Sequence, residues 1–277
     1  MTYMCRPQLS EWVVVSYLAL QHRFPTYWQQ QSQGRWAKLE DVPDDSVGRR
    51  IRPFKSSGIL GYGSIGRQTG RVAKALGMDV HAYTLHPRPT PESRRDTGYT
   101  PVGLGDPDGT LPSKWFSGSS TQELHNFLGS GLDLLVIATP LTEATRGLIA
   151  EAEFEILAKN KTFVSNIARG PVVDTDVLIR SLNNDSIRGA ALDVTDPEPL
   201  PEGHPLWTAK NVIITPHIDR IRYKDNGTPG NESRETKQRT APRKCSEQKN
   251  WLLVKKLGID DFKKCVASCN CASAVMV

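Results

Sequence analysis

The feature that most constrains the fold of this chain is a glycine-rich segment, Gly61-Tyr62-Gly63-Ser64-Ile65-Gly66, which matches the pattern G-x-G-x-x-G. Such a pattern carries meaning only when a short apolar strand precedes it and a helix follows it. The apolar run at residues 57–60 precedes it here, and apolar residues at helical spacing follow from Ile65 to Leu76, where Gly77 ends the helix. This context predicts a dinucleotide-binding α/β fold.

Each glycine of the segment has a distinct expected role. Gly61 permits the tight turn, Gly63 allows a pyrophosphate to approach the backbone, and Gly66 lets the helix pack on the strand. The amides of Ser64 and Ile65 then face the phosphates at the positive end of the helix. The alternative is a glycine-rich surface turn, which the flanking strand and helix disfavour.

Strand-like and helix-like segments alternate along the rest of the chain, which predicts a Rossmann-type, doubly wound parallel sheet with its ligand at the carboxyl ends of the strands. A long loop at residues 86–119 interrupts the alternation, and its Trp115-Phe116 pair indicates packing. The other expected strands are residues 79–83, 133–138, 162–165, 187–193 and 211–215, and the expected helices are residues 121–128, 151–159 and 173–182.

Three short segments, residues 166–170, 196–201 and 215–217, each end a stretch that reads as a strand. They supply an arginine, a glutamate and a histidine: Arg169, Glu198 and His217. A guanidinium grips a carboxylate or polarises a carbonyl. An imidazole delivers a proton at neutral pH, and a neighbouring carboxylate keeps it charged and oriented. Taken singly, these residues also fit a surface ion pair, a solvated loop carboxylate and a loop histidine; taken together, they predict reduction of a keto acid.

The chain resembles the D-isomer-specific 2-hydroxyacid dehydrogenases, within them the branch similar to glyoxylate/hydroxypyruvate reductases. The resemblance extends from about Glu11 to His217 and includes the segments at residues 138–142 and 189–194. It implies that Arg169 binds the substrate, a 2-keto or 2-hydroxy acid. It also implies that His217 is the catalytic acid and base and that Glu198 pairs with it.

The same resemblance implies the cofactor-binding residues beyond the glycine-rich segment. Asp193 is expected near the nicotinamide carboxamide, and Thr139-Pro140 is expected to line the cofactor, together with Ile167 and Ala168.

The choice between NAD and NADP is expected to depend on the end of the second strand. An NAD-specific fold usually has a carboxylate there to bind the ribose hydroxyls. This chain instead has Thr84 and, four residues later, Arg88, which is able to pair with a 2′-phosphate. We therefore expect NAD or NADP as the cofactor, with NADP slightly favoured; the alternative is that Arg88 is a solvated loop cation.

Three regions are expected along the chain: a linker helix and loop at residues 1–50, an NAD(P)-binding Rossmann domain at 51–218, and an atypical tail at 219–277. The linker helix is expected to span residues 10–31. The substrate domain of the family is expected to be largely missing, as in a truncated product or a wrong gene model, which would leave residues 12–20 exposed and association-prone. We expect the chain as written to bind a dinucleotide weakly and turn over little, and the full-length family form to be a homodimer.

The tail holds the excess of positive charge and most of the cysteines. Residues 219–277 contain 13 Lys/Arg and 7 Asp/Glu, a net charge of +6, whereas the remainder carries −1 of the total of +5. We expect this polar tail to be disordered. It also holds four of the five cysteines, Cys245, Cys265, Cys269 and Cys271, whose spacing does not match a zinc site, so no metal is expected.

Several other partners and locations are not expected. No nucleic-acid-binding module accompanies the basic residues. No apolar run approaches membrane-spanning length, and the N-terminal segment lacks the features of a signal peptide, so a cytoplasmic protein is expected. Two alternatives to an oxidoreductase remain: a catalytically silent dinucleotide-binding fragment, and a nucleotide-sensing interaction protein similar to the corepressor branch related to this family.

Overall fold

The computed structural model describes residues 7–36, 38 and 55–218, all of which belong to one compact unit, Met1–Gly227. The predictions for residues 39–50 of the linker and for the tail at 219–277, including its charge and its cysteines, fall outside the described residues.

The core of the described chain is a sheet of seven parallel strands in the order β3-β2-β1-β4-β5-β6-β7. The first strand along the chain lies inside the sheet, and the chain winds outward from it in both directions, which confirms the predicted doubly wound Rossmann-type fold. The strands are β1 (Ser56–Leu60), β2 (Asp79–Thr84), β3 (Lys114–Ser117), β4 (Leu134–Ile137), β5 (Phe163–Asn166), β6 (Gly189–Leu192) and β7 (Val212–Ile214).

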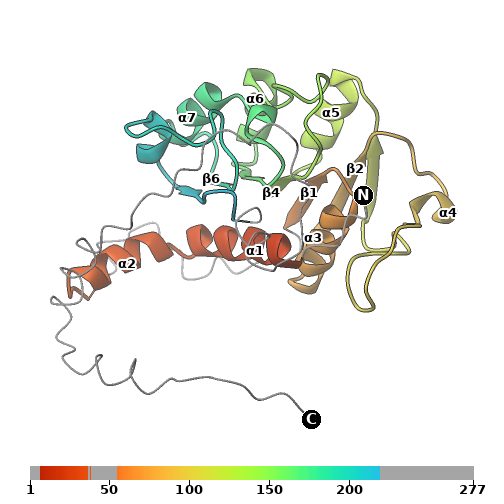
Figure 1. The fold of residues 1–277 in the computed structure, drawn as a ribbon, viewed down its shortest axis with the longest axis horizontal. Coiled ribbons are helices and arrows are strands. Elements are labelled where there is room, and N and C mark those ends of the chain that lie inside the picture. Colours follow the sequence, from red (N-terminus) through yellow and green to blue (C-terminus); the bar gives the residue numbers. More distant parts are fainter. Residues whose placement is uncertain (1–6, 37, 39–54, 219–277) are drawn as a thin grey trace, which may run out of the picture. The chain divides into compact units, whose positions relative to one another are not determined.

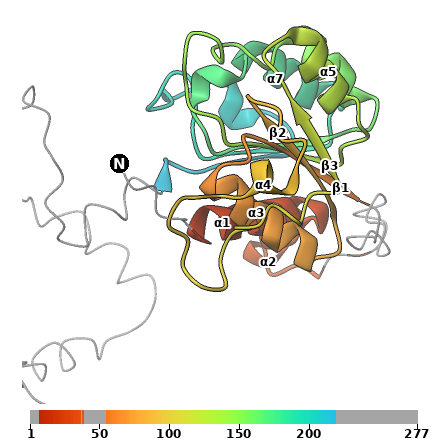
Figure 2. The ribbon, with the colours of Figure 1, turned by 90° about the vertical axis from the view of Figure 1, so that its right-hand side faces the viewer.

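Helices cover both faces of this sheet (Figure 1). On one face lie α1 and α3, and on the other lie α5, α6 and α7, as the view in Figure 2 also shows. The helices are α1 (Pro7–Gln21), α2 (Phe24–Ser32), α3 (Ser64–Ala75), α4 (Pro91–Arg94), α5 (Thr121–Leu128), α6 (Glu151–Ala158) and α7 (Thr175–Asn183), with short 3₁₀ turns η2 (Gly170–Val172) and η3 (Pro205–Thr208).

The apolar pattern of the strands explains this two-sided cover. Strands β4 and β6 are buried at every residue, as expected for parallel strands with helices on both faces. Successive side chains point to opposite faces, so Leu135 joins the core under α5–α7 while Leu134 and Val136 join the core under α1 and α3.

The predicted linker helix at residues 10–31 is wrong in one respect, because the structure has two helices there. They are separated at Arg23, whose φ of 59° lies in the left-handed region and interrupts the helical backbone. Pro25 then occupies the first turn of α2, where its missing amide proton removes no helical hydrogen bond. The apolar periodicity did not indicate this break.

The predicted loop at residues 86–119 is also wrong in part, since it contains α4 and the edge strand β3. Both elements have only four residues, too few for a periodic pattern to show. The packing role predicted for Trp115 and Phe116 is confirmed. The Trp115 ring contacts the Tyr62 ring with centroids 5.3 Å apart, and Phe116 contacts Phe127 at 5.5 Å.

The exposed apolar patch expected at residues 12–20 is largely absent. Trp12, Val13 and Tyr17 are buried against α3 and the sheet, and only Val15 among these residues' large side chains is strongly exposed, at 61%. The helix therefore stabilises the nucleotide-binding domain itself. In the described part of the chain, no helix is long and apolar enough to span a membrane.

Candidate functional site

The glycine-rich turn lies between the carboxyl end of β1 and the start of α3. Gly61 has a φ of 100°, and a Cβ atom there would lie 2.8 Å from the carbonyl oxygen of Ala138. The amides of Gly61 and Tyr62 both donate to the carbonyl oxygen of Tyr83, at 3.1 and 3.2 Å. Glycine at position 61 is thus required by both the backbone conformation and the close approach of the segment after β4.

The other two glycines of the turn differ in what surrounds them. A Cβ atom on Gly66 would lie 2.3 Å from the Gly61 carbonyl oxygen, so Gly66 is required for the helix to pack on the turn. A Cβ atom on Gly63 would meet no atom within 4 Å. Helix α3 begins at the next residue, Ser64, followed by Ile65, with no acidic side chain in its first turn. Open space at a helix N-terminus suits a phosphate group, which the amides there bind.

The segment after β4 lies beside this turn. Thr139 has a buried Oγ1 with no hydrogen-bond partner among the described residues, next to the exposed Pro140. Ile167 and Ala168, after β5, are only 7% and 5% exposed: Ile167 belongs to the core under α1 and α3, and Ala168 to the core under α5–α7. An unpaired buried hydroxyl is costly, so Thr139 is a group that a polar ligand would satisfy.

Thr84 is the last residue of β2, and Arg88 lies four residues later, as predicted. The Thr84 hydroxyl donates to the His86 carbonyl oxygen at 2.8 Å. The Arg88 guanidinium donates through Nη1 to the carbonyl oxygen of Ser93, at the end of α4, and its buried Nε has no partner within the described chain. Arg88 is therefore anchored to its own loop and is not simply a solvated cation.

Arg169 lies in a loop that the Asn166 side chain shapes. The Asn166 amide nitrogen donates to the Arg169 carbonyl oxygen at 3.0 Å, and its Oδ1 accepts from the Ala168 amide at 3.0 Å. A Cβ atom on Gly170 would lie 1.9 Å from the Thr195 carbonyl oxygen, so this loop packs tightly on the segment after β6. The Arg169 side chain is exposed and donates to the Ala168 carbonyl oxygen at 2.6 Å.

His217 and Glu198 form a direct pair. The distance from His217 Nδ1 to Glu198 Oε1 is 2.8 Å, and their side chains are 17% and 34% exposed. His217 has a φ of 53°, in the left-handed region, and its amide donates to the Thr215 carbonyl oxygen at 3.0 Å. This tight turn brings the His217 imidazole to the Glu198 carboxylate, which bonds to Nδ1. No described residue forms a hydrogen bond with Nε2.

Asp193 supports the turn that carries His217. Its Oδ1 accepts from the Thr215 hydroxyl at 2.6 Å and from the Ile218 amide at 3.0 Å, on either side of the histidine. Burial raises the pKa of Asp193, and these two hydrogen bonds oppose the rise. The structure thus adds Asn166 and Thr215 to the predicted residues. They lie three residues before Arg169 and two residues before His217, although their side-chain contacts give no sequence signal.

The three candidate catalytic residues follow adjacent strands: Arg169 follows β5, Glu198 follows β6, and His217 follows β7. The carboxyl ends of parallel strands share one edge of a sheet, so all three lie along the same edge as the glycine-rich turn. Only His217 and Glu198 are in direct contact, since Arg169 bonds to its own loop. Among the described residues no group of three or more His, Cys, Asp or Glu is arranged to hold a metal ion.

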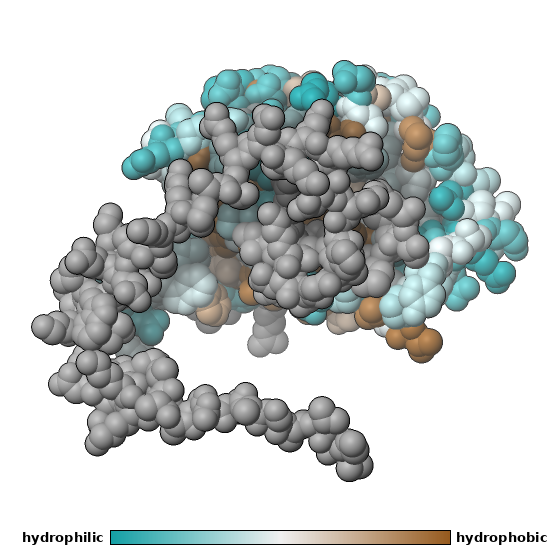
Figure 3. All heavy atoms as spheres, viewed as in Figure 1, coloured by the Kyte–Doolittle hydropathy of each residue, from teal (hydrophilic) through white to brown (hydrophobic). Residues whose placement is uncertain are grey.

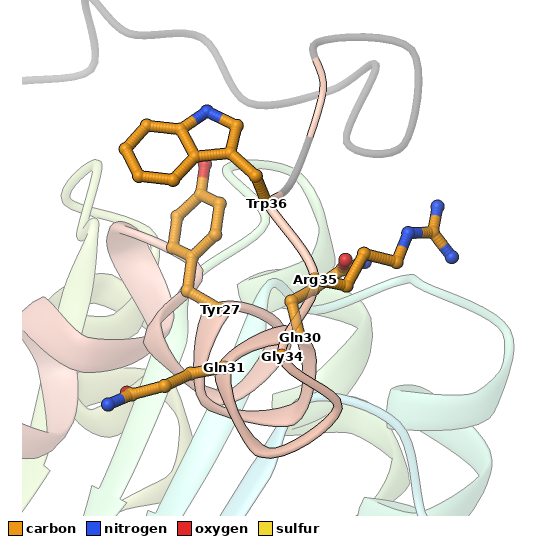
Figure 4. A pocket seen from close by; sticks show the side chains of 6 residues that line it. All are labelled: Tyr27, Gln30, Gln31, Gly34, Arg35 and Trp36. Atoms are coloured by element: carbon orange, nitrogen blue, oxygen red, sulfur yellow. The ribbon is translucent and has the colours of Figure 1, made fainter.

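One further hollow, of about 530 Å³, lies beside α2 (Figure 4). The Trp36 and Tyr27 rings lie next to each other there, while Arg35 and Gln31 point away in different directions. None of its lining residues belongs to the sheet or to the loops at its carboxyl edge. It is separate from the candidate catalytic residues.

A parallel nucleotide-binding sheet with arginine and a histidine–glutamate pair at its carboxyl edge defines a class: a Rossmann-type domain equipped for acid–base chemistry. Residues 14–106 and 113–219 match the family described as D-isomer specific 2-hydroxyacid dehydrogenase, NAD binding domain. The chain belongs to this family, as the sequence indicated.

The curated relatives are consistent with this assignment. A glyoxylate reductase from Thermococcus gammatolerans is 35% identical over 188 residues, which cover 68% of this chain and 47% of the relative. A glyoxylate reductase/hydroxypyruvate reductase from Mus musculus is 34% identical over 172 residues, 62% of this chain and 45% of the relative. The chain spans about half the length of these relatives.

Solved structures share the fold. The D-isomer specific 2-hydroxyacid dehydrogenase from Xanthobacter autotrophicus Py2, in complex with NADPH and MES, superimposes with a TM-score of 0.58 at 28% sequence identity. The match covers 83% of this chain and 89% of that chain.

Proposed function

We propose that this chain carries the cofactor-binding half and the acid–base pair of an NAD(P)-dependent oxidoreductase that acts on 2-hydroxy acids, of the glyoxylate/hydroxypyruvate reductase type. The observation that carries the proposal is the 2.8 Å contact between His217 Nδ1 and Glu198 Oε1. This pair lies on the same sheet edge as the glycine-rich turn. A proton donor and a hydride donor would therefore both be near the substrate.

The residues at this edge fit a dinucleotide. Gly63 leaves open space before the N-terminus of α3, where the amides of Ser64 and Ile65 would bind the pyrophosphate. The unpaired Thr139 hydroxyl and the Asp193 carboxylate would meet polar groups of the nicotinamide half. When bound, the reduced cofactor would supply a hydride to a carbonyl carbon.

The chain's own residues would supply the proton and hold the substrate. Glu198 fixes the imidazole through Nδ1, so His217 Nε2 would donate to the substrate carbonyl oxygen. Arg169 is exposed and its guanidinium uses one donor on the Ala168 carbonyl oxygen, which leaves donors for a substrate carboxylate. Together these groups would reduce a 2-keto acid to a 2-hydroxy acid.

The activity test is oxidation of NADPH or NADH by the chain in the presence of glyoxylate or hydroxypyruvate. His217→Ala should lower turnover by roughly a hundredfold or more, within the range for general acid catalysis. His22→Ala is the matched control, because His22 is exposed between α1 and α2 and has no expected role. Turnover in His217→Ala equal to that of the control would remove His217 from the mechanism.

For the cofactor we propose a preference for NADP, based on Thr84 at the end of β2 and Arg88 four residues later. Neither position offers a carboxylate that would repel a 2′-phosphate, and Arg88 is held close to its loop by the Ser93 carbonyl oxygen. Arg88→Ala should weaken NADPH binding and leave NADH binding unchanged. Arg95→Ala is the control, because Arg95 is exposed in the same loop and pairs with Asp108 at 3.8 Å. An unchanged NADPH/NADH ratio in Arg88→Ala would refute this preference.

The two non-enzymatic alternatives are not favoured by the comparisons, because the named relatives are reductases and dehydrogenases. A pull-down of protein partners with and without dinucleotide tests the nucleotide-sensing alternative. Dinucleotide binding without turnover of glyoxylate or hydroxypyruvate would support the other alternative, a catalytically silent dinucleotide-binding fragment.

We further propose that the chain pairs with a second copy through α1 and α2. Helix α2 has no buried residue and no charged side chain. Of the eight exposed large apolar residues in the described part of the chain, four belong to α1, α2 or the residues just after them: Val15, Phe24, Trp28 and Trp36. On the face shown in Figure 3, outside the area covered by grey atoms, hydrophobic residues form only small, scattered groups. Trp28→Glu should convert a dimer to a monomer in analytical ultracentrifugation; Trp207→Glu, at another exposed tryptophan, should not.

A further inference from the structure

A buried polar network connects the glycine-rich turn to the loop that carries Arg88. Tyr62, inside the turn, is 3% exposed, and its hydroxyl donates to Asp106 Oδ2 at 2.9 Å. Asp106 is also 3% exposed and accepts from the amides of Thr110 and Leu111 at 3.0 and 3.2 Å. The turn and the loop are therefore joined through one buried carboxylate.

Arg67, the residue immediately after the last glycine of the turn, makes the second connection. It is 3% exposed, and its guanidinium donates to the backbone carbonyl oxygens of Asp106 and Arg94, the latter at 2.6 Å. Its Nε lies 3.7 Å from Asp96 Oδ2. Burial lowers the pKa of Arg67, and the nearby Asp96 opposes this. A planar fork that spans two carbonyl groups fixes both in place, which a lysine cannot do.

Arg94 passes this restraint on to Arg88. The Arg94 Nε donates to the Arg88 carbonyl oxygen at 3.0 Å, and its Nη2 donates to the Pro89 carbonyl oxygen at 3.3 Å. Its guanidinium also lies over the Trp115 ring, 5.6 Å from the centroid. Arg67 therefore holds the backbone of Arg94, and Arg94 holds the backbone of Arg88.

We propose that Arg67 is a positioning residue that selects the phosphorylated dinucleotide, a role that rests on the proposed binding of a 2′-phosphate by Arg88. Arg67 lies in the first turns of α3, the helix whose N-terminus faces the proposed pyrophosphate site. One rigid helix thus fixes the spacing between the pyrophosphate site and the cation expected to bind the 2′-phosphate. A cation held in place before binding loses less entropy when the ligand arrives.

The first test compares Arg67→Lys with Arg71→Lys. Both residues lie on α3 and reach the same loop, but within the described residues Arg71 bonds to one carbonyl oxygen, that of Gly105, at 3.2 Å. Titration of each protein with NADPH and with NADH gives two dissociation constants. Arg67→Lys should raise the NADPH constant roughly tenfold and leave the NADH constant within about twofold, since the fork is lost and the charge is kept. An equal change for both dinucleotides, or the same result in Arg71→Lys, would overturn the proposal.

A double-mutant cycle then tests whether Arg67 acts through Arg88. In the Arg88→Ala background, Arg67→Lys should have no further effect on NADPH binding, because the cation that it positions is gone. Additive losses would show that Arg67 acts independently of Arg88 and would overturn the proposal. If Arg67→Lys fails to fold, Tyr62→Phe replaces it, because this change removes only the hydroxyl bound to Asp106 and should weaken NADPH selectively, by a smaller factor.

A measurement without cofactor separates this proposal from the proposed function. Hydrogen exchange at the amides of residues 88–96 should be faster in Arg67→Lys than in Arg71→Lys, because the Arg94 carbonyl loses its partner. Unchanged exchange there would overturn the positioning role. Failure of the wild-type chain to bind either dinucleotide would instead overturn the proposed function. Normal NADPH selectivity in Arg67→Lys, with selectivity lost in Arg88→Ala, would overturn only the role of Arg67.

Discussion

His81 and His217 each have a carboxylate neighbour, as His125 also does, and yet these two differ in what they are able to do. His81, in β2, is 1% exposed; its Nε2 lies 3.2 Å from Asp79 Oδ2 and its Nδ1 lies 2.7 Å from Ser130 Oγ. His217, after β7, has one nitrogen on Glu198 and, in the described part of the chain, no partner at the other.

The difference lies in the second ring nitrogen. Protein groups use both nitrogens of His81, so it ties β2 to the turn after α5 and has no atom left for a ligand. Burial lowers the pKa of His81, with Lys114 adding to the effect, which favours the neutral ring. A histidine–carboxylate pair therefore does not define a catalytic site by itself; an accessible second nitrogen at the ligand edge of the sheet is also needed.

The largest expected effect contrasts the two histidines in stability. His81→Ala should lower the free energy of unfolding by about 2–4 kcal/mol, because it leaves a cavity and unpairs Asp79 and Ser130. His217→Ala should lower it by less, about 1 kcal/mol, since the His217 side chain is more exposed than that of His81, at 17% against 1%, and has one described side-chain partner. Urea unfolding of both variants measures this, and similar losses would remove the distinction between them.

The next effect concerns the carboxylates. Glu198→Gln removes the negative charge 2.8 Å from the His217 imidazole. Turnover in keto-acid reduction should fall by roughly tenfold or more, because the imidazole loses the charged partner that orients it for proton transfer. Asp79→Asn, the corresponding change beside His81, should leave turnover unchanged. Equal turnover in Glu198→Gln and in the unchanged chain would mean that the pair does not act in proton transfer.

A smaller effect is a pH dependence of stability that comes from His81. Its pKa in the folded protein is lowered from the ordinary value of 6.5, so the unfolded chain binds a proton at a higher pH than the folded one. Stability should therefore fall as the pH is lowered through about 6.5, with a slope of at most about 1.4 kcal/mol per pH unit. His81→Gln does not titrate there and should show a flatter curve in thermal unfolding between pH 5 and 7.5. Identical slopes in the two proteins would assign the dependence to other groups.

The smallest effect is expected for an exposed ion pair whose contact distance is close to that of His217 and Glu198. Lys210 Nζ lies 2.9 Å from Asp185 Oδ2, but both side chains are more than half exposed, at 55% and 56%. Lys210→Ala should change the free energy of unfolding by no more than about 0.5 kcal/mol, because water screens such pairs. A larger loss in urea unfolding would show that contact distance outweighs burial in this protein.

The sequence predicted those parts of the molecule that local pattern determines. The strand before Gly61 and the helix after it are encoded by neighbouring residues, and so are the residue types at 169, 198 and 217. The break at Arg23 and the four-residue strand β3 were missed, because they depend on a single left-handed residue and on pairing with β2.

Side-chain directions were less predictable than residue positions. Whether Arg88 points to solvent or to Ser93 depends on the conformation of its loop. Arg67, which lies in α3, bonds to the Arg94 carbonyl oxygen of that loop. The orientation of His217 depends on Asp193, which lies 24 residues earlier in the chain. The Asp193 carboxylate accepts hydrogen bonds from Thr215 and Ile218, on either side of His217. Contacts between distant segments leave no periodic trace in the sequence.

The strand order also has a consequence for the time at which function arises during folding. Strands β1, β2 and β3 form one half of the sheet from the early part of the described chain, and β4 to β7 add outward one after another. During synthesis from the N-terminus, the residues of the glycine-rich turn are made well before those of β7, after which His217 meets Glu198. The acid–base pair is therefore complete only when the last strand of the sheet is in place.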